Sequence, residues 1–246
     1  MEKSRVLVVG GTGYIGKRIV KASLAQGHPT YVLHRREIGS TYDIDKLQML
    51  LSFKEAGARL VEASFDDHRS LVDAVKQVDV VICTMSGVHF RSHNILLQLK
   101  LVEAIKEAGN IKRFVPSEFG MDPARMGNAM EAGRVTFDEK MEIRKAIEEA
   151  NIPHTYISAN CFAGYFCGNL SQLGSLLPPK HTAYIYGTGN VKDMDFVGQV
   201  GVIFYYHIFF EGCLTNFEIG DDGEEASQLY PEVHYTRMDE YLKRYL

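Results

Sequence analysis

The sequence lacks a long hydrophobic run, a strong net charge and any opening segment of the secretory type. Its most apolar stretch, Val200–Phe210, is too short to span a bilayer and contains His207. No charged segment followed by an apolar one opens the chain, so we expect no signal peptide. The formal net charge of −4 gives no reason to expect nucleic acid as a partner. We therefore expect a cytoplasmic protein that binds neither membrane nor nucleic acid.

The sequence also lacks cysteines spaced for metal or disulfide chemistry. None of the four cysteines forms a Cys-x-x-Cys pair. They are Cys83, Cys161, Cys167 and Cys213. Reduced, buried thiols are the simplest interpretation. His89 and His93 can share a helix face, but the sequence places no third ligand beside them, so we predict no metal site.

A strand, a glycine-rich turn and a helix open the chain. Apolar Arg5–Val9 leads into a turn, and helical spacing then continues to Gln26. The turn reads Gly10-Gly11-Thr12-Gly13-Tyr14-Ile15-Gly16. The first glycine of the motif permits a tight turn, the second lets the backbone approach phosphates, and the third lets the helix pack against the strand. The N–H groups at the helix start suit a pyrophosphate. The GxxGxxG spacing is typical of short-chain and extended dehydrogenases.

The residues after the second expected strand indicate which dinucleotide binds. NAD-specific sites usually place Asp or Glu there to bind the ribose 2′-hydroxyl. Here Thr30–Leu33 is followed by His34-Arg35-Arg36-Glu37. Guanidinium groups bind a 2′-phosphate, whereas a carboxylate repels it. We therefore favour NADPH, with Arg35 as the leading contact and Lys46 as a second cation. Glu37 lies past the strand end and leaves NAD as the alternative.

Short apolar strands alternate with helical periodicity over the first 160 residues. The expected strands are Arg5–Val9, Thr30–Leu33, Arg59–Glu62, Val78–Thr84, Arg113–Pro116 and His154–Ala159. The expected helices are 14–26, 45–56, 68–76, 93–108, 135–150 and 162–172. This pattern predicts an α/β fold with a doubly wound (Rossmann) parallel sheet. We assign residues 1–160 to an NADPH-binding domain and 161–246 to a smaller substrate-binding lobe, which includes a strand at Ala183–Tyr186 and a closing helix at Met238–Leu246.

The usual Tyr-x-x-x-Lys pair of short-chain dehydrogenases is missing from its expected place. Its one literal match, Tyr42 to Lys46, follows the second strand, at the adenosine end of the cofactor. On the helix after the fifth strand the lysine is Lys140, and the residue four before it is Thr136. Because threonine cannot act as a phenolic acid, we do not expect carbonyl reduction.

Lys140 begins a helical segment near the carboxyl ends of the strands, where ligands bind in this architecture. If it is partly desolvated there, its pKa falls and it can act as a general base. The alternative is a solvated lysine paired with Asp138 or Glu139.

Other side chains have two open interpretations each. Ser117 occupies the place of a serine near the reacting carbon, and Glu118 can cap the next turn. Asp66-Asp67 suits an adenine contact or a helix N-cap. His207 lines an aromatic ligand pocket or is simply packed and hydrogen-bonded.

With these residues identified, the chain resembles the plant pinoresinol–lariciresinol reductases, in the group that also holds isoflavone reductases and phenylcoumaran benzylic ether reductases. The glycine turn carries part of the resemblance. More specific are the blocks Ala63-Ser64-Phe65-Asp66-Asp67-His68, Lys112-Arg113-Phe114-Val115-Pro116-Ser117-Glu118-Phe119-Gly120-Met121-Asp122-Pro123, Asn160-Cys161-Phe162-Ala163-Gly164-Tyr165-Phe166 and Ser86-Gly87-Val88-His89-Phe90-Arg91-Ser92-His93.

The resemblance implies NADPH as cofactor, a lignan substrate and Lys140 as the general base. The base removes a phenol proton, the benzylic ether bond breaks, and the resulting quinone methide accepts hydride. Two rounds convert pinoresinol to lariciresinol and then to secoisolariciresinol. The resemblance also implies that Asn160 and Phe162 lie beside the nicotinamide. It further implies that Phe166 and His207 face the substrate and that the protein is a homodimer. The expected cofactor-binding residues are Gly10, Thr12, Gly13, Tyr14, Ile15, Gly16, Arg35, Lys46, Ser86, Ser117, Asn160 and Phe162.

One departure from the family is large. Family members continue after Gly189-Asn190-Val191-Lys192 with several dozen residues of the substrate lobe. Here Lys192 leads directly to Asp193-Met194-Asp195-Phe196, which resembles sequence from well downstream. Either the sequence as given omits this segment, which we favour because a true deletion would fold poorly, or the chain is a shortened form. In both cases we expect a complete cofactor half and a shortened substrate half. The alternatives are a phenylcoumaran benzylic ether or isoflavone reductase and, in another class, a non-catalytic NADPH-binding regulator.

Overall fold

The structure is a computed structural model that describes residues 3–35, 44–87, 94–160, 162, 196–213, 217–221 and 223–243. Some sequence predictions lie outside these ranges. They concern Arg36, Glu37, Tyr42, His89, His93, Cys161, Phe166, Cys167, the strand at Ala183–Tyr186 and the junction of Lys192 with Asp193. The division into domains at residue 160 likewise stays a prediction.

Five parallel strands form one sheet in the order β3-β2-β1-β4-β5. They are β1 Val6–Val9, β2 Thr30–His34, β3 Arg59–Glu62, β4 Val80–Cys83 and β5 Arg113–Val115. The chain runs outward from β1 to β3 and then crosses back to β4 on its other side. This order confirms the predicted doubly wound α/β fold.

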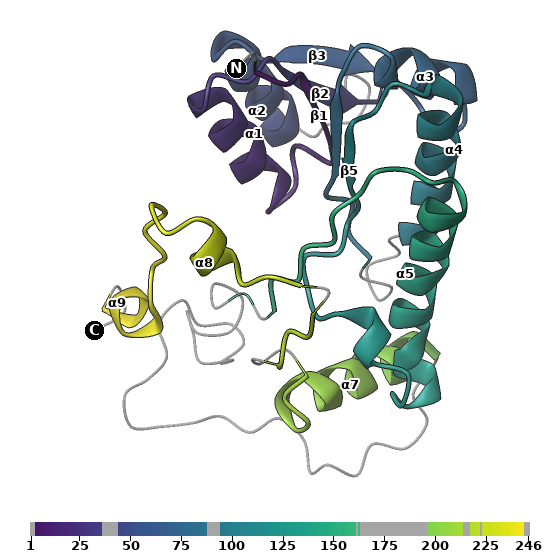
Figure 1. The fold of residues 1–246 in the computed structure, drawn as a ribbon, viewed down its shortest axis with the longest axis vertical. Helices are drawn as coiled ribbons and strands as arrows, with labels where there is room; N and C mark the ends of the chain where they lie inside the picture. The colour runs from purple at the N-terminus through teal and green to yellow at the C-terminus, as the bar shows by residue number, and fades with distance from the viewer. Residues whose placement is uncertain are drawn as a thin grey trace.

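Helices cover both faces of the sheet (Figure 1). On one face lie α1 Gly16–Ala25 and α2 Ile44–Glu55. On the other lie α3 His68–Val75, α4 Gln98–Ala108 and α5 Glu131–Glu149. Strand β1 serves both cores, because Val6 and Val8 pack with α1 and α2 while Leu7 and Val9 pack with the other three helices. Successive side chains of a strand point to opposite faces, which explains this division.

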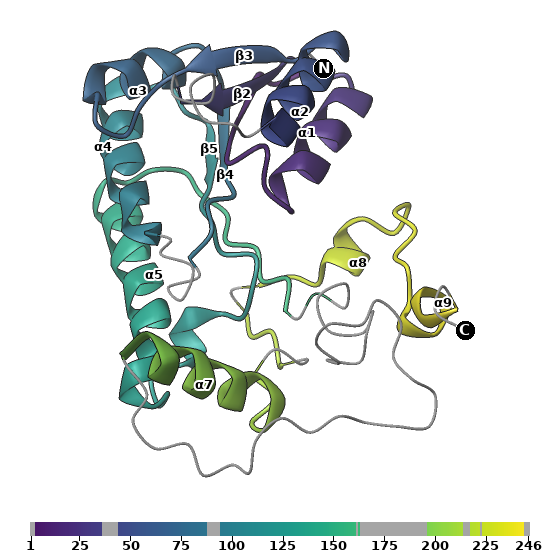
Figure 2. The same cartoon turned by 180° about the vertical axis from the view of Figure 1, so that it is seen from behind.

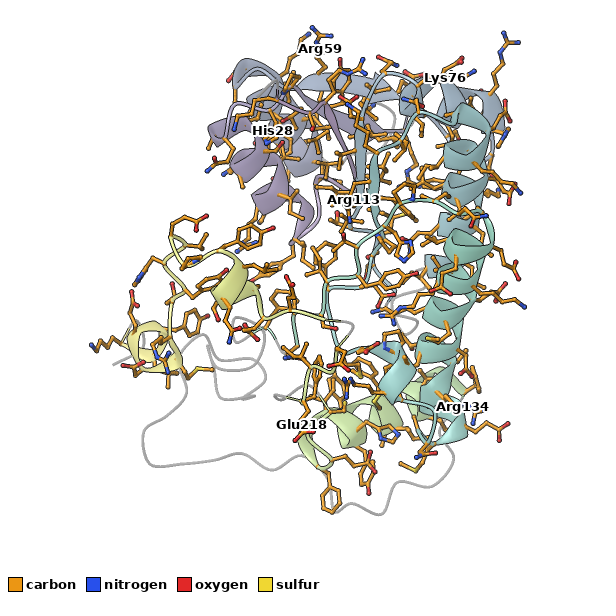
Figure 3. All side chains as sticks on the ribbon, in the orientation of Figure 1. His28, Arg59, Lys76, Arg113, Arg134 and Glu218 are labelled. Atoms are coloured by element: carbon orange, nitrogen blue, oxygen red, sulfur yellow. The ribbon has the colours of Figure 1, made fainter. Side chains whose placement is uncertain are left out.

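A third, smaller core lies at the end of α5 farther from the sheet. Helix α7, Phe196–Phe209, crosses α5 near its start in both views of the ribbon (Figures 1 and 2). A Cβ on Gly133 of α5 would lie 2.5 Å from the Ile203 side chain of α7, so glycine permits this close approach. The buried residues of this core are Met121, Met126, Ala129, Phe137 and Ile208. Figure 3 places Arg134 and Glu218 at this end and Arg59 and Lys76 at the opposite one.

The remaining described elements are short. They are the 3₁₀ turns η3 Ile95–Leu97 and η4 Pro123–Arg125, and the helices α8 Ala226–Leu229 and α9 Met238–Leu242. Within the described ranges no helix combines the length and apolarity that crossing a lipid bilayer requires.

The structure differs from the sequence prediction at several elements. Helices α7 and α8 were not predicted, and β4 is shorter than the expected Val78–Thr84. The expected sixth strand, His154–Ala159, pairs with β5 only through an isolated bridge between Phe114 and His154. It lies at the sheet edge, where most of its side chains are at least partly exposed and favour no further pairing. Helix α5 begins at Glu131 rather than at residue 135, and Gly133 in this added turn is buried against Ile203 of α7.

The close packing at Gly16 gives a first test. A Cβ there would lie 2.2 Å from the carbonyl oxygen of Gly10, so Gly16→Ala forces the backbone apart. We expect the free energy of unfolding to fall by about 1–3 kcal/mol in urea denaturation. Gly127→Ala is the matched control, because a Cβ at Gly127 meets nothing within 4 Å. Equal stabilities for the two variants would contradict the packing described for the turn.

Candidate functional site

The glycine-rich turn is held between β1, α1 and the end of β4. Gly10 has a φ of 79°, which favours glycine, and a Cβ there would lie 2.9 Å from the Thr84 hydroxyl. The Thr84 hydroxyl donates to the carbonyl oxygens of Val9 at 2.9 Å and Gly10 at 3.1 Å. The strand end, the turn and the neighbouring strand are therefore locked together.

The outer side of this turn suits an anion. No described side chain caps the start of α1, and its first turn carries no acidic residue. A Cβ on Gly13 would meet only the Gly10 carbonyl oxygen, at 3.2 Å, so the exposed side of Gly13 faces open space in the described structure. Thr12 and Ile15 are partly exposed, and Tyr14 is 38% exposed. This cradle and the helix dipole fit the pyrophosphate of a dinucleotide.

The two expected contacts to a 2′-phosphate lie beyond the end of β2. Arg35 is exposed directly after His34, and Lys46 is exposed in the first turn of α2. Both cations are on the surface at the strand's carboxyl end, where the adenosine half of a dinucleotide binds in this fold.

The carboxyl ends of β4 and β5 are tied together by Ser117. Its hydroxyl donates to the carbonyl oxygen of Met85, and its backbone N–H donates to the Gln98 side chain at 2.8 Å. Ser117 is buried, whereas Ser86, next to Met85, is exposed. The Ser117 hydroxyl therefore holds two strand ends in register beside the site.

Asn160 and Phe162 come back to the same place. The backbone N–H groups of Ala159 and Asn160 donate to the Gly120 carbonyl oxygen at 3.1 and 3.2 Å. The Phe162 ring meets the edge of the Tyr14 ring, with centroids 6.3 Å apart. The Asn160 side-chain oxygen is buried and has no hydrogen-bond partner among the described residues. An orphaned amide oxygen beside the glycine turn fits a ligand that carries a donor, such as a carboxamide.

Lys140 lies next to this segment. Its Nζ donates to the Glu118 carbonyl oxygen at 2.7 Å and lies 3.7 Å from the point that a Cβ on Gly120 would occupy. The pKa of Lys140 is lowered, chiefly because burial disfavours the charged amine. The Glu118 carboxylate opposes this decrease, and the Arg144 guanidinium adds to it. Asp138, the suggested partner of a solvated lysine, instead pairs with Arg134 at 3.1 Å.

A buried ion cluster holds the Glu118 segment, and the sequence analysis did not anticipate it. Arg144 donates from Nε and Nη2 to the two carboxylate oxygens of Glu118, at 3.0 and 3.1 Å. Its Nη1 lies 2.9 Å from Asp122, and its guanidinium stacks over the Tyr156 ring at 4.2 Å. The one signal in the sequence was Arg144 itself, a basic residue four positions after Lys140 on a largely apolar helix face. Glu118 therefore pairs with Arg144 in this structure.

His207 is 1% exposed and lies in the small core between α5 and α7. Its Nε2 accepts a hydrogen bond from the Met130 N–H at 3.1 Å, so Nδ1 carries the proton and donates to Glu211. Both ring nitrogens are thus engaged, in keeping with the packed interpretation left open by the sequence. Asp67 accepts from the Ser70 N–H at 3.2 Å and caps α3, whereas Asp66 pairs with Lys100.

Comparisons with known proteins agree with this geometry. Residues 2–193 match the NmrA-like family. The chain is 60% identical to an isoflavone reductase homolog from Lupinus albus and 58% identical to a bifunctional pinoresinol-lariciresinol reductase from Linum perenne, with 100% of each chain covered. A solved structure described as AtPrR2 with NADP+ and (+)pinoresinol has a TM-score of 0.88 and 52% identity, again over 100% of both chains.

The first two alignments extend over 314 and 316 residues, which is longer than this chain of 246. Several dozen residues of each relative therefore face gaps. The location of the missing segment after Lys192 stays a prediction.

The engaged ring of His207 gives a stability test. His207→Leu leaves the Met130 N–H and the Glu211 carboxylate without their partner, so we expect the free energy of unfolding to fall by about 1–3 kcal/mol. The matched control is His234→Leu, because the His234 side chain is 81% exposed; we expect its change to stay within about 0.5 kcal/mol. Urea denaturation measures both. A fully stable His207→Leu protein would contradict the packing account.

Proposed function

The chain belongs to the NmrA-like family, among the plant pinoresinol–lariciresinol and isoflavone reductase-like proteins, and from that premise we propose that it is an NADPH-dependent reductase of lignan benzylic ethers. Its substrate is pinoresinol, which it reduces to lariciresinol and then to secoisolariciresinol. Names of relatives support both steps, since several are bifunctional pinoresinol-lariciresinol reductases.

One observation carries the proposal: a partly buried lysine amine lies beside the expected cofactor site, on a helix whose usual tyrosine position holds a threonine. The Lys140 Nζ is anchored on the Glu118 carbonyl oxygen, and Gly120 in the same segment accepts hydrogen bonds from the backbone of Ala159 and Asn160. Thr136 stands four residues before Lys140 and offers no phenol. A base without a phenolic acid suits removal of a substrate proton, not protonation of a carbonyl product.

The residues of the glycine turn would hold NADPH by its pyrophosphate, with Arg35 and Lys46 toward the 2′-phosphate. The buried Asn160 amide oxygen would bind the nicotinamide carboxamide. Bound NADPH supplies the hydride for the reaction.

Lys140 supplies the proton chemistry. Its depressed pKa gives a larger neutral fraction near neutral pH, and the neutral amine accepts the phenol proton of the lignan. The phenolate then pushes electrons through the ring, the benzylic C–O bond breaks, and the departing alkoxide takes a proton from solvent. The quinone methide accepts hydride at the benzylic carbon, and the phenolate so formed takes back the proton held by Lys140. A neutral phenol pushes poorly, so loss of the base stops the reaction before the bond breaks.

We also propose a cytoplasmic homodimer with Phe166 and His207 toward the substrate. These assignments come from the family resemblance. For His207, a hydrogen bond to the substrate would require a ring nitrogen to leave its partner, Met130 or Glu211.

Turnover of racemic pinoresinol with NADPH tests the function. We expect the protein to form lariciresinol, which chiral chromatography of the products detects. Lys140→Ala should lower kcat at least about 100-fold because the base is lost. NADPH fluorescence should show unchanged cofactor binding by the variant. Lys145→Ala is the matched control, since Lys145 is an exposed lysine on the same helix, with a side chain 74% exposed.

The outcomes separate the alternatives. Full turnover by Lys140→Ala would contradict the assignment of Lys140 as the general base. Turnover of a phenylcoumaran or an isoflavone, but not of pinoresinol, assigns the chain to the related activities. NADPH binding without oxidation of any of these substrates favours the non-catalytic regulator.

A further inference from the structure

The ion cluster beside Lys140 contains more charge than structural packing needs. Glu118 is 6% exposed and Arg144 is 9% exposed, and Asp122 adds a second carboxylate to the same guanidinium. Asp122 is only partly buried, whereas burying Glu118 and Arg144 is costly unless they are paired, and a well-packed apolar set often serves stability as well. The position of the cluster, one helical turn from a candidate base, suggests a further purpose.

Lys140 and Arg144 are four residues apart on α5, so their side chains lie on one face of the helix. The Lys140 amine binds the main-chain oxygen of Glu118, while the carboxylate of that residue is turned to Arg144 in a two-point contact. The amine therefore lies near the carboxylate without pairing with it. An ammonium group next to an unpaired carboxylate would stay protonated and could not act as a base.

We infer that Arg144 occupies the Glu118 and Asp122 carboxylates so that the amine of Lys140 stays neutral and free to accept a proton. Arg144 is then a positioning residue, which acts on the substrate only through Lys140. The inference rests on the proposed function in one respect, the role of Lys140 as base. The opposite effects of Glu118 and Arg144 on the pKa of Lys140 support it.

Among the described residues, Glu118 and Arg144 are the charged groups that shift the pKa of Lys140. The segment after β5 contributes Glu118 and Asp122, and the Tyr156 phenol lies beyond Arg144, where it donates to Glu148. The charged residues of α4 are all exposed. They are Lys100, Glu103, Lys106 and Glu107. On α5 itself, Asp138 and Glu142 are exposed, and Glu139 precedes Lys140 by one residue, which places it on another face of the helix. The 3₁₀ turn η3 carries no charged residue. The charged residue of η4 is Arg125, which pairs with Asp122 at 3.4 Å. From α7, His207 accepts a hydrogen bond from the N–H of Met130, which precedes α5 and lies ten residues before Lys140.

The test uses variants with opposite expected signs. Glu118→Gln removes a negative charge, so the Lys140 amine should lose its proton at a pH lower by about one unit. Arg144→Met uncovers two carboxylates, so the same midpoint should rise by about one unit or more. Arg144→Lys keeps the charge and should leave the midpoint within about half a unit of wild type.

Two readouts are measured on the full chain. Competitive acetylation of Lys140 with acetic anhydride, followed by mass spectrometry across pH, gives the midpoint without substrate. The acidic limb of kcat/KM for pinoresinol should move in parallel. Arg134→Met, on the same helix but in an exposed pair with Asp138, is the matched control and should shift neither.

Some variants can unfold, because removing one partner of a buried pair leaves the other unpaired. If Arg144→Met does not fold, the double variant Glu118→Gln/Arg144→Met replaces it, and its midpoint should lie above that of Glu118→Gln alone. The inference is overturned if the midpoint of Lys140 deprotonation does not move in Glu118→Gln and Arg144→Met, or if it moves in the same direction in both variants. Failure of the wild type to reduce pinoresinol overturns the proposed function, while acetylation still decides the charge of Lys140.

Discussion

The site depends on the buried pair between Glu118 and Arg144. This contact fixes the segment after β5, and the carbonyl oxygen of that segment in turn holds the Lys140 amine at 2.7 Å. Removing one partner from a buried pair of this kind costs about 3–5 kcal/mol, so the pair strongly restrains the loop. The same residues determine the electrostatic field at the base. One interaction thus controls both where the lysine lies and how readily it releases its proton.

The rest of the fold brings the other components to this point. Parallel strands end at one edge of the sheet, so the glycine turn after β1 and the segment after β5 lie on the same side. Thr84 locks the turn to β4, and Ser117 ties β4 to β5. Phe162 then contacts Tyr14 of the turn. The cofactor cradle and the base therefore share one rigid frame.

Local patterns predicted much of this arrangement, and long-range pairings did not. The glycine turn, the five strands and the place of Lys140 follow from spacing along the chain, which a single sequence displays. The Glu118–Arg144 pair joins residues 26 positions apart, and the spacing of residues in the sequence did not predict that Glu118 pairs with Arg144. The same holds for His207, whose partner Met130 lies 77 positions away. The prediction of a sixth strand was wrong because strand pairing depends on neighbouring segments, which the local sequence does not specify.

A crystal structure with NADP+ and pinoresinol bound tests the central claim most directly. The measured quantity is the distance from the Lys140 Nζ to the phenolic oxygen of the aromatic ring that bears the scissile benzylic ether. We predict a distance of about 2.6–3.2 Å, with the amine still held by the Glu118 carbonyl oxygen and Arg144 still paired with its two carboxylates. A lignan whose phenol lies out of reach of Lys140, with another side chain on its oxygen, would contradict it.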